Sequence, residues 1–501
     1  ITNCNFSNNG DNANSVIYSV CPKMIVEYNI FTSDKTTRAI ELAVFAEITI
    51  EENTFTNFHT TERGGAIILR EPRNLKSSTM LAVTAQKYEI KNCTFTRCGS
   101  SMDGGSLYIA QNVQQVTVED CIFDGGSIDP SQNNGGQGVA IYISNIEQFT
   151  ISSSVKFINQ NCNGKFLIAS QCQNFNAENI VIENTGAGAG IKGIQIQQGK
   201  ATIKNVFFSK CISGLEVFRE VTEAKIQDCI FSDCYELNSN QYKGYVVRIA
   251  NTKCTFTRNI VNFTNNEEAS TGLWVASHGD IQITHNKFIK VRRSDDYKAA
   301  IIIVEEVGSA TENEVRFNYN LIEDVGTNVE QFGALRIEKK ERFNIDHNIL
   351  NGCKRITGKN GYLCEIDLKN SKENKKEFTL TNFTVSNCET HCKTGGGFGL
   401  LIEFMDNEGT FTLQNCHFSN NIAGKEQNGG YGGAFDCGGN SNKMTLNVID
   451  CDFTENTAKI AGGALSIRST KPADIINCQF INCQSENDGG AIYLYTDNQL
   501  Y

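Results

Sequence analysis

Proline and long apolar runs are the two features that this sequence of 501 residues most plainly lacks. It contains four prolines, and none lies between Pro130 and Pro472. Proline removes a hydrogen-bond donor from a β-sheet, so this long interval favours continuous strand pairing. The longest apolar candidate, residues 299–304, falls far short of the roughly 18 residues that a membrane-spanning helix needs. The sequence therefore predicts no membrane span in this segment.

A positive net charge is also missing. The chain has 45 Lys and Arg residues against 56 Asp and Glu residues, which gives a formal net charge of −11 at pH 7. Proteins that bind nucleic acids in a general way present a basic stripe to the phosphates. The short basic run at residues 339–342 contains an acidic residue and fits a solvated turn. We therefore expect no nucleic-acid partner.

One strand pattern, by contrast, recurs from end to end. In residues 88–95 apolar residues alternate, two polar residues interrupt, and the alternation resumes one position out of phase. A continuous strand would place Ile90 and Cys93 on opposite faces, whereas a two-residue corner lets both point inward. Asn and Asp tolerate the left-handed backbone of such corners. One of them is the second corner residue at Asn3, Asn92, Asp120, Asn205, Asp228, Asn382, Asn415, Asp450 and Asn477.

The residue after each corner marks successive repeats. Most intervals between successive post-corner residues are at least as long as the one from residue 206 to residue 229 and at most as long as the one from residue 348 to residue 383. Only the first two are longer, which predicts inserted loops within residues 10–48 and 56–88. The post-corner residues are Cys4, Asn53, Cys93, Cys121, Val155, Ile180, Val206, Cys229, Asn259, Asn286, Asn320, Asn348, Phe383, Cys416, Cys451 and Cys478.

A glycine pair followed by a strand alternates with this corner, as in residues 64–67, 432–435 and 462–465. In a solenoid each repeat packs only on its neighbours, so a chain of this length does not need several separate cores. We predict an all-β fold in which residues 1–501 form a single right-handed parallel β-helix, a solenoid of about 16 rungs. The chain starts and stops inside a repeat, so we expect it to be a segment of a longer protein.

The paired motifs Gly-Gly-Ala-aliphatic and Phe-x-x-Asn resemble the repeats of chlamydial polymorphic outer-membrane proteins and of similar surface proteins of protists. Residues 6–9, 418–421 and 453–456 carry the second motif. More broadly, the chain is similar to the pectin-lyase-like β-helix superfamily, which also contains polysaccharide-degrading enzymes.

The first resemblance implies a non-enzymatic extracellular or cell-surface protein that serves adhesion or structural assembly. Its partners would be other surface or matrix proteins, or glycans, and it could assemble with further copies or flanking domains. The second resemblance implies the alternative of a glycoside hydrolase, a lyase or a glycan-binding module.

Twenty cysteines occur, and many fall in the post-corner column or three residues after its large apolar partner. Neighbouring rungs lie ~4.8 Å apart, which is inside the Cα window for a disulfide. In-register side chains point the same way, however, which strains such a bond. Two interpretations therefore stand: a stack of buried thiols, or disulfides among Cys93, Cys121, Cys211, Cys234, Cys353, Cys388, Cys416, Cys451 and Cys478. The chain has no Cys-x-x-Cys pair; Cys388, His391 and Cys392 come nearest to a metal-binding motif, and we expect no such site there.

Four Asn-x-Ser/Thr sequons are candidate glycosylation sites, at Asn5, Asn92, Asn262 and Asn382. Two of them, Asn92 and Asn382, lie at predicted surface corners, where a glycan could be accommodated. Together with the repeat type, they favour an extracellular location.

Enzymes of the pectin-lyase-like superfamily place their sites on the outer face of the strand after the glycine corner. Outward aromatic rings on this strand could stack on sugars or serve as rigid surface contacts. The outward residues there include Tyr108 with Tyr142, Arg248 with Trp274, and Tyr493.

The same face is predicted to carry an acidic column over four consecutive repeats, formed by Glu338, Glu365, Asp367, Glu403 and Asp436. Like charges at neighbouring ladder positions repel, so a bound cation, a basic loop or a raised pKa would relieve the repulsion. Asp367 and Glu403 are candidate calcium ligands. Glu365, Asp367, Glu403 and Asp436 are the candidates for a catalytic carboxylate pair. A plain solvated acidic face is the third interpretation, and no cofactor other than calcium is expected.

Overall fold

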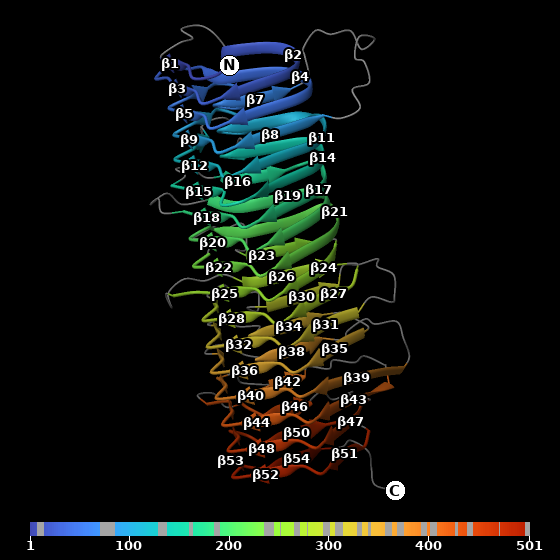
Figure 1. Cartoon of the computed structure of the whole chain (residues 1–501). Helices are drawn as coiled ribbons and strands as arrows, with labels where there is room; N and C mark the ends of the chain where they lie inside the picture. The colour runs from blue at the N-terminus through green and yellow to red at the C-terminus, as the bar shows by residue number, and fades with distance from the viewer. Residues whose placement is uncertain are drawn as a thin grey trace. The chain divides into compact units, whose positions relative to one another are not determined.

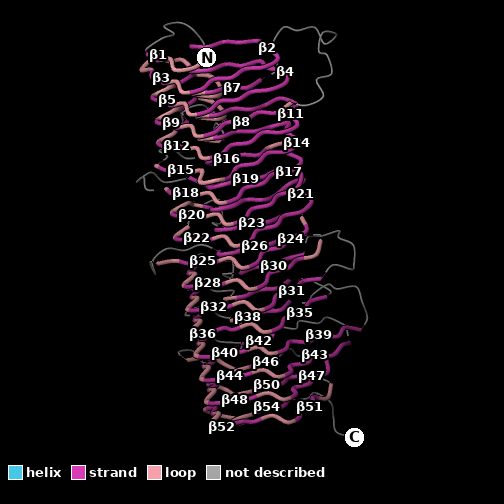
Figure 2. The backbone as a smooth tube through the Cα atoms, viewed as in Figure 1, coloured by secondary structure: helices cyan, strands magenta, loops and turns pink. Residues whose placement is uncertain are grey.

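The structure is a computed structural model. It describes residues 1–7, 15–70, 86–128, 138–159, 164–184, 191–234, 245–250, 252–264, 271–277, 279–293, 301–305, 314–327, 333–338, 342–355, 363–367, 375–391, 398–400, 408–425, 429–437, 444–469 and 471–495. Every regular element among these residues is a β-strand, and the strands pair in parallel (Figure 1, Figure 2). The predicted all-β fold with parallel sheets is thus confirmed. Within this part of the chain, no helix has the length and apolar character needed to cross a membrane.

The chain divides into two compact units, Ile1–Asn240 (unit 1) and Gln241–Tyr501 (unit 2). Each unit repeats a short strand, then one or more longer strands, and each strand pairs with its equivalent in the next repeat. The short strands of unit 1 are β1 (Asn5–Ser7), β3 (Ile30–Thr32), β5 (Thr54–Thr56), β9 (Thr94–Thr96), β12 (Ile122–Asp124), β15 (Lys156–Ile158), β18 (Val181–Glu183), β20 (Phe207–Ser209) and β22 (Ile230–Ser232). Its other strands are β2 (Ser15–Glu27), β4 (Arg38–Glu51), β6 (His59–Thr60), β7 (Ile67–Arg70), β8 (Lys87–Lys91), β10 (Gly99–Ser100), β11 (Leu107–Glu119), β13 (Ser127–Ile128), β14 (Ile141–Ser152), β16 (Gly164–Ala169), β17 (Cys172–Glu178), β19 (Ile191–Lys204) and β21 (Ser213–Gln227).

Unit 2 follows the same plan. Its short strands are β25 (Ile260–Asn262), β28 (Lys287–Ile289), β32 (Leu321–Glu323), β36 (Ile349–Asn351), β40 (Thr384–Ser386), β44 (His417–Ser419), β48 (Asp452–Thr454) and β52 (Gln479–Ile481). Most of its other strands are longer: β23 (Tyr245–Ala250), β24 (Lys253–Thr257), β26 (Thr271–Ser277), β27 (Ile281–Thr284), β30 (Ile301–Glu305), β31 (Glu314–Asn318), β34 (Leu335–Glu338), β35 (Arg342–Asp346), β38 (Cys364–Asp367), β39 (Lys375–Thr381), β43 (Glu408–Gln414), β47 (Met444–Ile449), β50 (Leu465–Arg468), β51 (Ala473–Ile476) and β54 (Ile492–Tyr495). Two further strands, β42 (Phe398–Leu400) and β46 (Phe435–Cys437), have three residues each. Two-residue strands complete it: β29 (Arg292–Arg293), β33 (Gly326–Thr327), β37 (Lys354–Arg355), β41 (Glu389–Thr390), β45 (Ile422–Ala423), β49 (Thr457–Ala458) and β53 (Gln484–Ser485).

The short strands lie between left-handed corners. All nine Asn and Asp residues predicted as corners have φ between 50° and 56°. Most repeats have a second such corner five positions later, as with Asn92 (φ 51°) and Arg97 (φ 52°) on either side of β9. The two corners turn the chain while the residues between them keep the alternating inward and outward pattern of a strand.

One expected insertion is wrong. Described residues within 10–48 form β2, β3 and the start of β4, which pair with neighbouring repeats. Tyr28 is the corner residue (φ 56°), and Asn29 is the buried post-corner residue. The long first interval therefore contains a further repeat. The second expected insertion, within 56–88, includes β6 and β7, and residues 71–85 lie outside the described residues.

The inward faces form columns that run across the repeats. Phe95 and Phe123 belong to a row of stacked rings in unit 1, with centroids 4.7 Å apart and an interplanar angle of 0°. The post-corner asparagines are buried and bind one another: the Asn320 Oδ1 accepts hydrogen bonds from the backbone N–H and the side-chain Nδ2 of Asn286, both at 3.0 Å. Burial of the apolar columns, together with the hydrogen bonds between these buried asparagines, holds the repeats in register.

The structure explains the glycine pairs. The first glycine takes a positive φ, 60° at Gly432 and 68° at Gly462. The second lies directly over the next repeat: a Cβ on Gly433 would lie 2.1 Å from the carbonyl oxygen of Gly463. A side chain at either position would therefore strain the backbone or separate the repeats.

Candidate functional site

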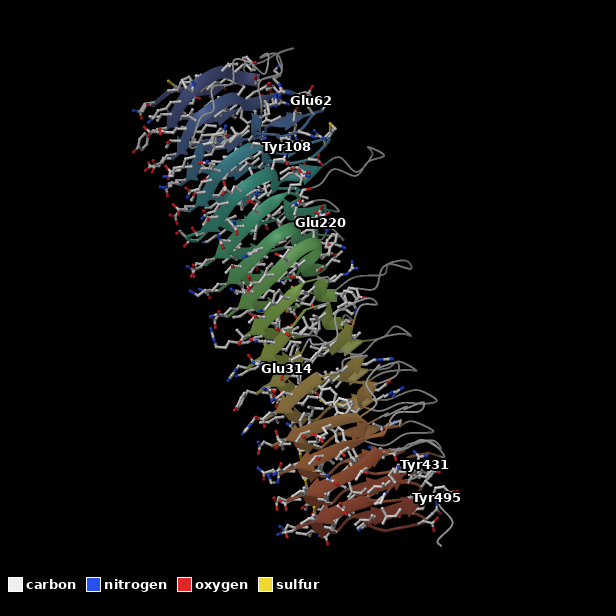
Figure 3. The ribbon with its side chains drawn as sticks, turned by 90° about the vertical axis from the view of Figure 1, so that its right-hand side faces the viewer. Glu62, Tyr108, Glu220, Glu314, Tyr431 and Tyr495 are labelled. Atoms are coloured by element: carbon white, nitrogen blue, oxygen red, sulfur yellow. The ribbon has the colours of Figure 1, made fainter. Side chains whose placement is uncertain are left out.

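The predicted outward pairs do lie on neighbouring strands. Tyr108 of β11 and Tyr142 of β14 are register partners, and their rings stack with centroids 5.2 Å apart. Tyr108, labelled in Figure 3, is only 7% exposed, and the Arg63 guanidinium lies 5.2 Å from the centre of its ring. In unit 2, Arg248 lies over its register partner Trp274 at 5.2 Å. An arginine thus packs against an aromatic ring at both places.

At Glu365 and Asp436 the structure differs from the predicted acidic column. Glu365 has Arg336 as its register partner, with Arg336 Nη2 3.7 Å from Glu365 Oε1. Asp436 has Gly399 as its register partner, so it does not continue a row of carboxylates. Glu338 and Asp367 are register partners along the backbone, but their side chains, like Glu403, lie outside the described residues. The described carboxylates of this face are therefore not stacked on like charges.

Asp436 is held by a basic residue as well. It is completely buried, and Arg468 Nη2 donates to its Oδ2 at 2.9 Å. The same guanidinium lies 4.5 Å from the ring centre of Tyr431, which is labelled in Figure 3. Tyr493, the third predicted aromatic position, lies 6.3 Å from Tyr431 between ring centres. This arrangement neutralises the buried carboxylate.

His391 contacts a carboxylate of its own strand region. Its Nε2 is within hydrogen-bond distance of Glu389 Oε1, and Lys425 Nζ lies 3.0 Å from the same oxygen. Burial alone would raise the pKa of Glu389, but the bonds from His391 and Lys425 outweigh it and lower that pKa. Cys392 lies outside the described residues. Among the residues that the structure does describe, no group of three or more His, Cys, Asp or Glu is placed to hold a metal ion.

A groove of about 370 Å³ lies in unit 1, and sequence reasoning missed it. Its lining comes from residues 112–114 of β11, 145–147 of β14, 171–173 at the start of β17, and Gln198 of β19. Each of the three segments has an apolar residue between two polar ones. The middle residues Val113, Ile146 and Cys172 are register partners and at most 2% exposed. Because side chains alternate along a strand, the flanking polar residues stand outward.

Irregular pairing shapes this groove. Between the register pairs Ala110–Ser144 and Val113–Ile146, β11 has one residue more than β14. An extra residue of this kind bends the strand. Gly199 of β19 has a φ of 87°, and a Cβ there would lie 2.0 Å from the Cys172 carbonyl oxygen. Burial also raises the pKa of the Cys172 thiol to about 12, so the floor is uncharged.

The polar side chains of the groove are exposed and largely unused. Gln171 Oε1 accepts a hydrogen bond from Ser144 Oγ at 3.2 Å. The side chains of five exposed lining residues have no hydrogen bond to another described residue: Asn112, Gln114, Asn145, Glu147 and Gln173. The recurring triplet of polar, apolar and polar residues was the signal in the sequence, but a bulge displaces it from the regular pattern. The groove can offer several amide donors and acceptors to one ligand.

The cysteines proposed for bridging are all free thiols in this structure. The sulfur atoms contact pairwise across neighbouring repeats instead. The hydrogen bond between Cys416 and Cys451 raises the pKa of the first and lowers that of the second. This arrangement agrees with a stack of buried thiols. The other contacting pairs are Cys93 with Cys121, Cys211 with Cys234, and Cys353 with Cys388.

The sequons differ in their surroundings. Asn5 and Asn92 are exposed, whereas Asn262 and Asn382 are partly buried. The Asn382 amide nitrogen donates to Asp346 Oδ1 at 2.8 Å. The Asn92 side chain has no hydrogen bond to another described residue. The exposed corner at Asn92 is thus more accessible than the corner at Asn382.

No protein-family description matches the chain, and no curated protein matches it significantly.

Proposed function

We propose that the chain is a non-enzymatic extracellular or cell-surface protein that presents a long binding surface for adhesion or structural assembly. In this proposal it forms one right-handed parallel β-helix. The repeat around Asn29 adds one rung to the about sixteen that the sequence predicts. The same two-corner repeat in both units supports this, because a shared repeat lets equivalent residues align from one rung to the next.

The observation that carries the proposal is the groove of unit 1. Three successive strands each contribute an outward polar pair to one concave surface. Repetition thus produces a binding surface that is larger than any single loop. The described carboxylates that were candidates for catalysis favour a structural role, since Glu365 and Asp436 each have an arginine beside them.

The likeness to polymorphic outer-membrane-protein repeats gains support from one motif. Its Phe-x-x-Asn asparagine has a mechanical role in unit 2: Asn456 Nδ2 donates to the Phe418 carbonyl at 2.8 Å, and Asn456 Oδ1 accepts from Asn421 Nδ2 at 2.9 Å. That motif therefore ties one repeat to the previous one. The members of this family are adhesins and coat proteins, which agrees with the proposed role.

The test is a binding screen of the purified chain against surface proteins, matrix proteins and glycans, with the glycans recovered and sized afterwards. We expect saturable binding to at least one ligand, which is recovered intact. Cleavage of a glycan, lost in Glu365→Gln while the fold is retained, would instead establish the hydrolase or lyase alternative. Surface labelling of cells from the native source tests the location separately.

A further inference from the structure

The groove of unit 1 has a chemistry that narrows its ligand. We propose that it binds a neutral oligosaccharide, held by the side-chain amides of three successive strands. This inference rests on the proposed binding function and names the ligand class of the same surface.

The groove contains side-chain amides that make no hydrogen bond to another described residue. A primary amide both donates and accepts hydrogen bonds, and so does a sugar hydroxyl. Asn112, Asn145 and Gln173 are exposed in the groove, and their side chains have no hydrogen bond to another described residue. The buried asparagines of the repeat columns behave differently, since Asn320 uses both its oxygen and its nitrogen within the fold. The groove amides are therefore available to an external ligand.

The charge of the groove favours a neutral ligand over an anionic one. Glu147 lines the groove, and none of its lining residues, all of them described, is Lys or Arg. Glu220, labelled in Figure 3, is exposed and is the register partner of Gln198 on the next strand. The Glu147 carboxylate, in a lining without a basic residue, repels an anion. Uronic-acid polymers are thereby disfavoured, and neutral sugars are favoured.

Strand pairing argues against an extended peptide as the ligand. A peptide that adds to a sheet needs a free strand edge. β14 pairs with β11 on one side and with β17 on the other, and β17 also pairs with β19. The groove therefore offers side chains and no free backbone edge. The lining runs over the four strands β11, β14, β17 and β19, a width of about 14 Å at the usual strand spacing, which suits an oligosaccharide better than a single sugar.

The floor keeps these amides in place. Val113, Ile146 and Cys172 are buried beneath the polar residues, and Gly199 leaves no room for a side chain. A rigid floor reduces the entropy lost when a ligand orders the side chains above it.

The experiment measures binding of cellohexaose, maltohexaose, mannohexaose and a galacturonic-acid hexamer to the whole chain by calorimetry. We expect at least one neutral hexamer to bind and the galacturonate to bind more weakly. Asn112→Ala, Asn145→Ala and Gln173→Ala should each weaken neutral binding by about 3- to 10-fold. Gln148→Ala is the matched control, because Gln148 is an exposed amide of β14 outside the groove lining and should bind as wild type. Glu147→Gln should raise the affinity for galacturonate and leave neutral binding within about 3-fold.

The outcomes separate this inference from the function it rests on. Binding to a surface protein with no neutral hexamer bound would overturn the groove assignment and leave the proposed function in place. Cleavage of a hexamer would overturn the non-enzymatic function, and the alanine variants would still report whether the groove holds the sugar. Neutral binding that all three alanine variants retain, with unchanged melting temperatures, would also overturn the assignment.

Discussion

The carboxylate of Glu365 lies beside the guanidinium of Arg336 on the neighbouring strand, with Oε1 and Nη2 3.7 Å apart. The side chains are 4% and 13% exposed, so the pair is mostly shielded from water. Opposite charges on adjacent strands attract, whereas the like charges expected there would have repelled. The ion pair thus stabilises the stacking of two repeats.

Removing this carboxylate should destabilise unit 2. In Glu365→Gln, the Arg336 charge stays shielded but loses the Glu365 carboxylate, and we expect a loss of roughly 2–4 kcal/mol in the free energy of unfolding. Urea titration and thermal melting measure the change. Glu314→Gln is the control: Glu314 (labelled in Figure 3) pairs with Arg316 at 2.7 Å, but the two side chains are 33% and 52% exposed. An exposed pair contributes less than about 1 kcal/mol. Equal losses in the two variants would contradict a stabilising role for the shielded pair.

The repeat could be predicted because its corners depend on local backbone chemistry. Nine Asn and Asp residues signalled positive φ, and all nine have it. The repeat at Asn29 was not predicted, and its corner residue Tyr28 does not explain this, because Tyr319 (φ 58°) occupies the same corner before Asn320, where a repeat was predicted. The alignment of outward side chains was harder, since it depends on register between strands joined by variable loops. Tyr108 and Tyr142 were paired correctly, whereas Glu365 was not matched with Arg336. The groove depends on a bulge, which no local motif marks.

Replacement of the second glycine by alanine should have very different effects on stability in different glycine pairs. A Cβ on Gly463 would lie 2.1 Å from the Gly490 carbonyl oxygen and 2.4 Å from backbone atoms of Gln484. Gly463→Ala should therefore cost about 1–3 kcal/mol, because backbone must move. At Gly490 the nearest atom to such a Cβ is the Cys483 carbonyl oxygen, 3.8 Å away, so Gly490→Ala should cost less than about 0.5 kcal/mol. Melting temperatures of the two variants check this, and similar losses would refute the close-approach explanation.

The column of buried asparagines should be sensitive to the loss of a single side-chain amide. Asn320→Ala removes the acceptor for the Asn286 N–H and the donor to the Ile283 carbonyl, which it reaches at 2.9 Å. Buried groups left unpaired cost about 1–3 kcal/mol each, so we expect a loss of about 3–5 kcal/mol in urea unfolding. Asn344→Ala, at an exposed position of β35, is the control and should change stability by less than about 0.5 kcal/mol.

A thiol should partly replace Asn320. Cysteine occupies the same column elsewhere, and the Cys93 thiol contacts the Lys91 carbonyl at 3.1 Å. Asn320→Cys should therefore be more stable than Asn320→Ala, because the thiol fills the space and can donate weakly. An Asn320→Cys variant no more stable than the alanine variant would show that only the amide is accommodated there.

Buried thiols should make the fold sensitive to alkali. Burial raises the pKa of the Cys98 thiol and of the Cys254 thiol from 9.0 to about 12. Between these values the unfolded chain loses a proton that the folded chain keeps, so stability is fully present below pH 9 and falls as the pH rises towards 12. Each such thiol contributes a slope of about 1.4 kcal/mol per pH unit. We measure the free energy of unfolding of the reduced protein in urea from pH 8 to 11. Its decrease with rising pH should be less steep in Cys254→Ala. Cys4→Ala, which removes an exposed thiol, should leave the slope unchanged.

Glycan occupancy tests the proposed location together with the sequons. Asn92 lies at an exposed corner, and its side chain has no hydrogen bond to another described residue. The Asn382 amide instead binds Asp346, so a glycan there would have to share or displace that contact. In secreted protein from the native source, glycopeptide mass spectrometry should find a larger occupied fraction at Asn92 than at Asn382. Higher occupancy at Asn382 would show that the folded surroundings do not govern the choice of site. Bare asparagines at Asn5, Asn92, Asn262 and Asn382, with every cysteine reduced, would count against an extracellular protein, because secreted chains pass through an oxidising, glycosylating compartment.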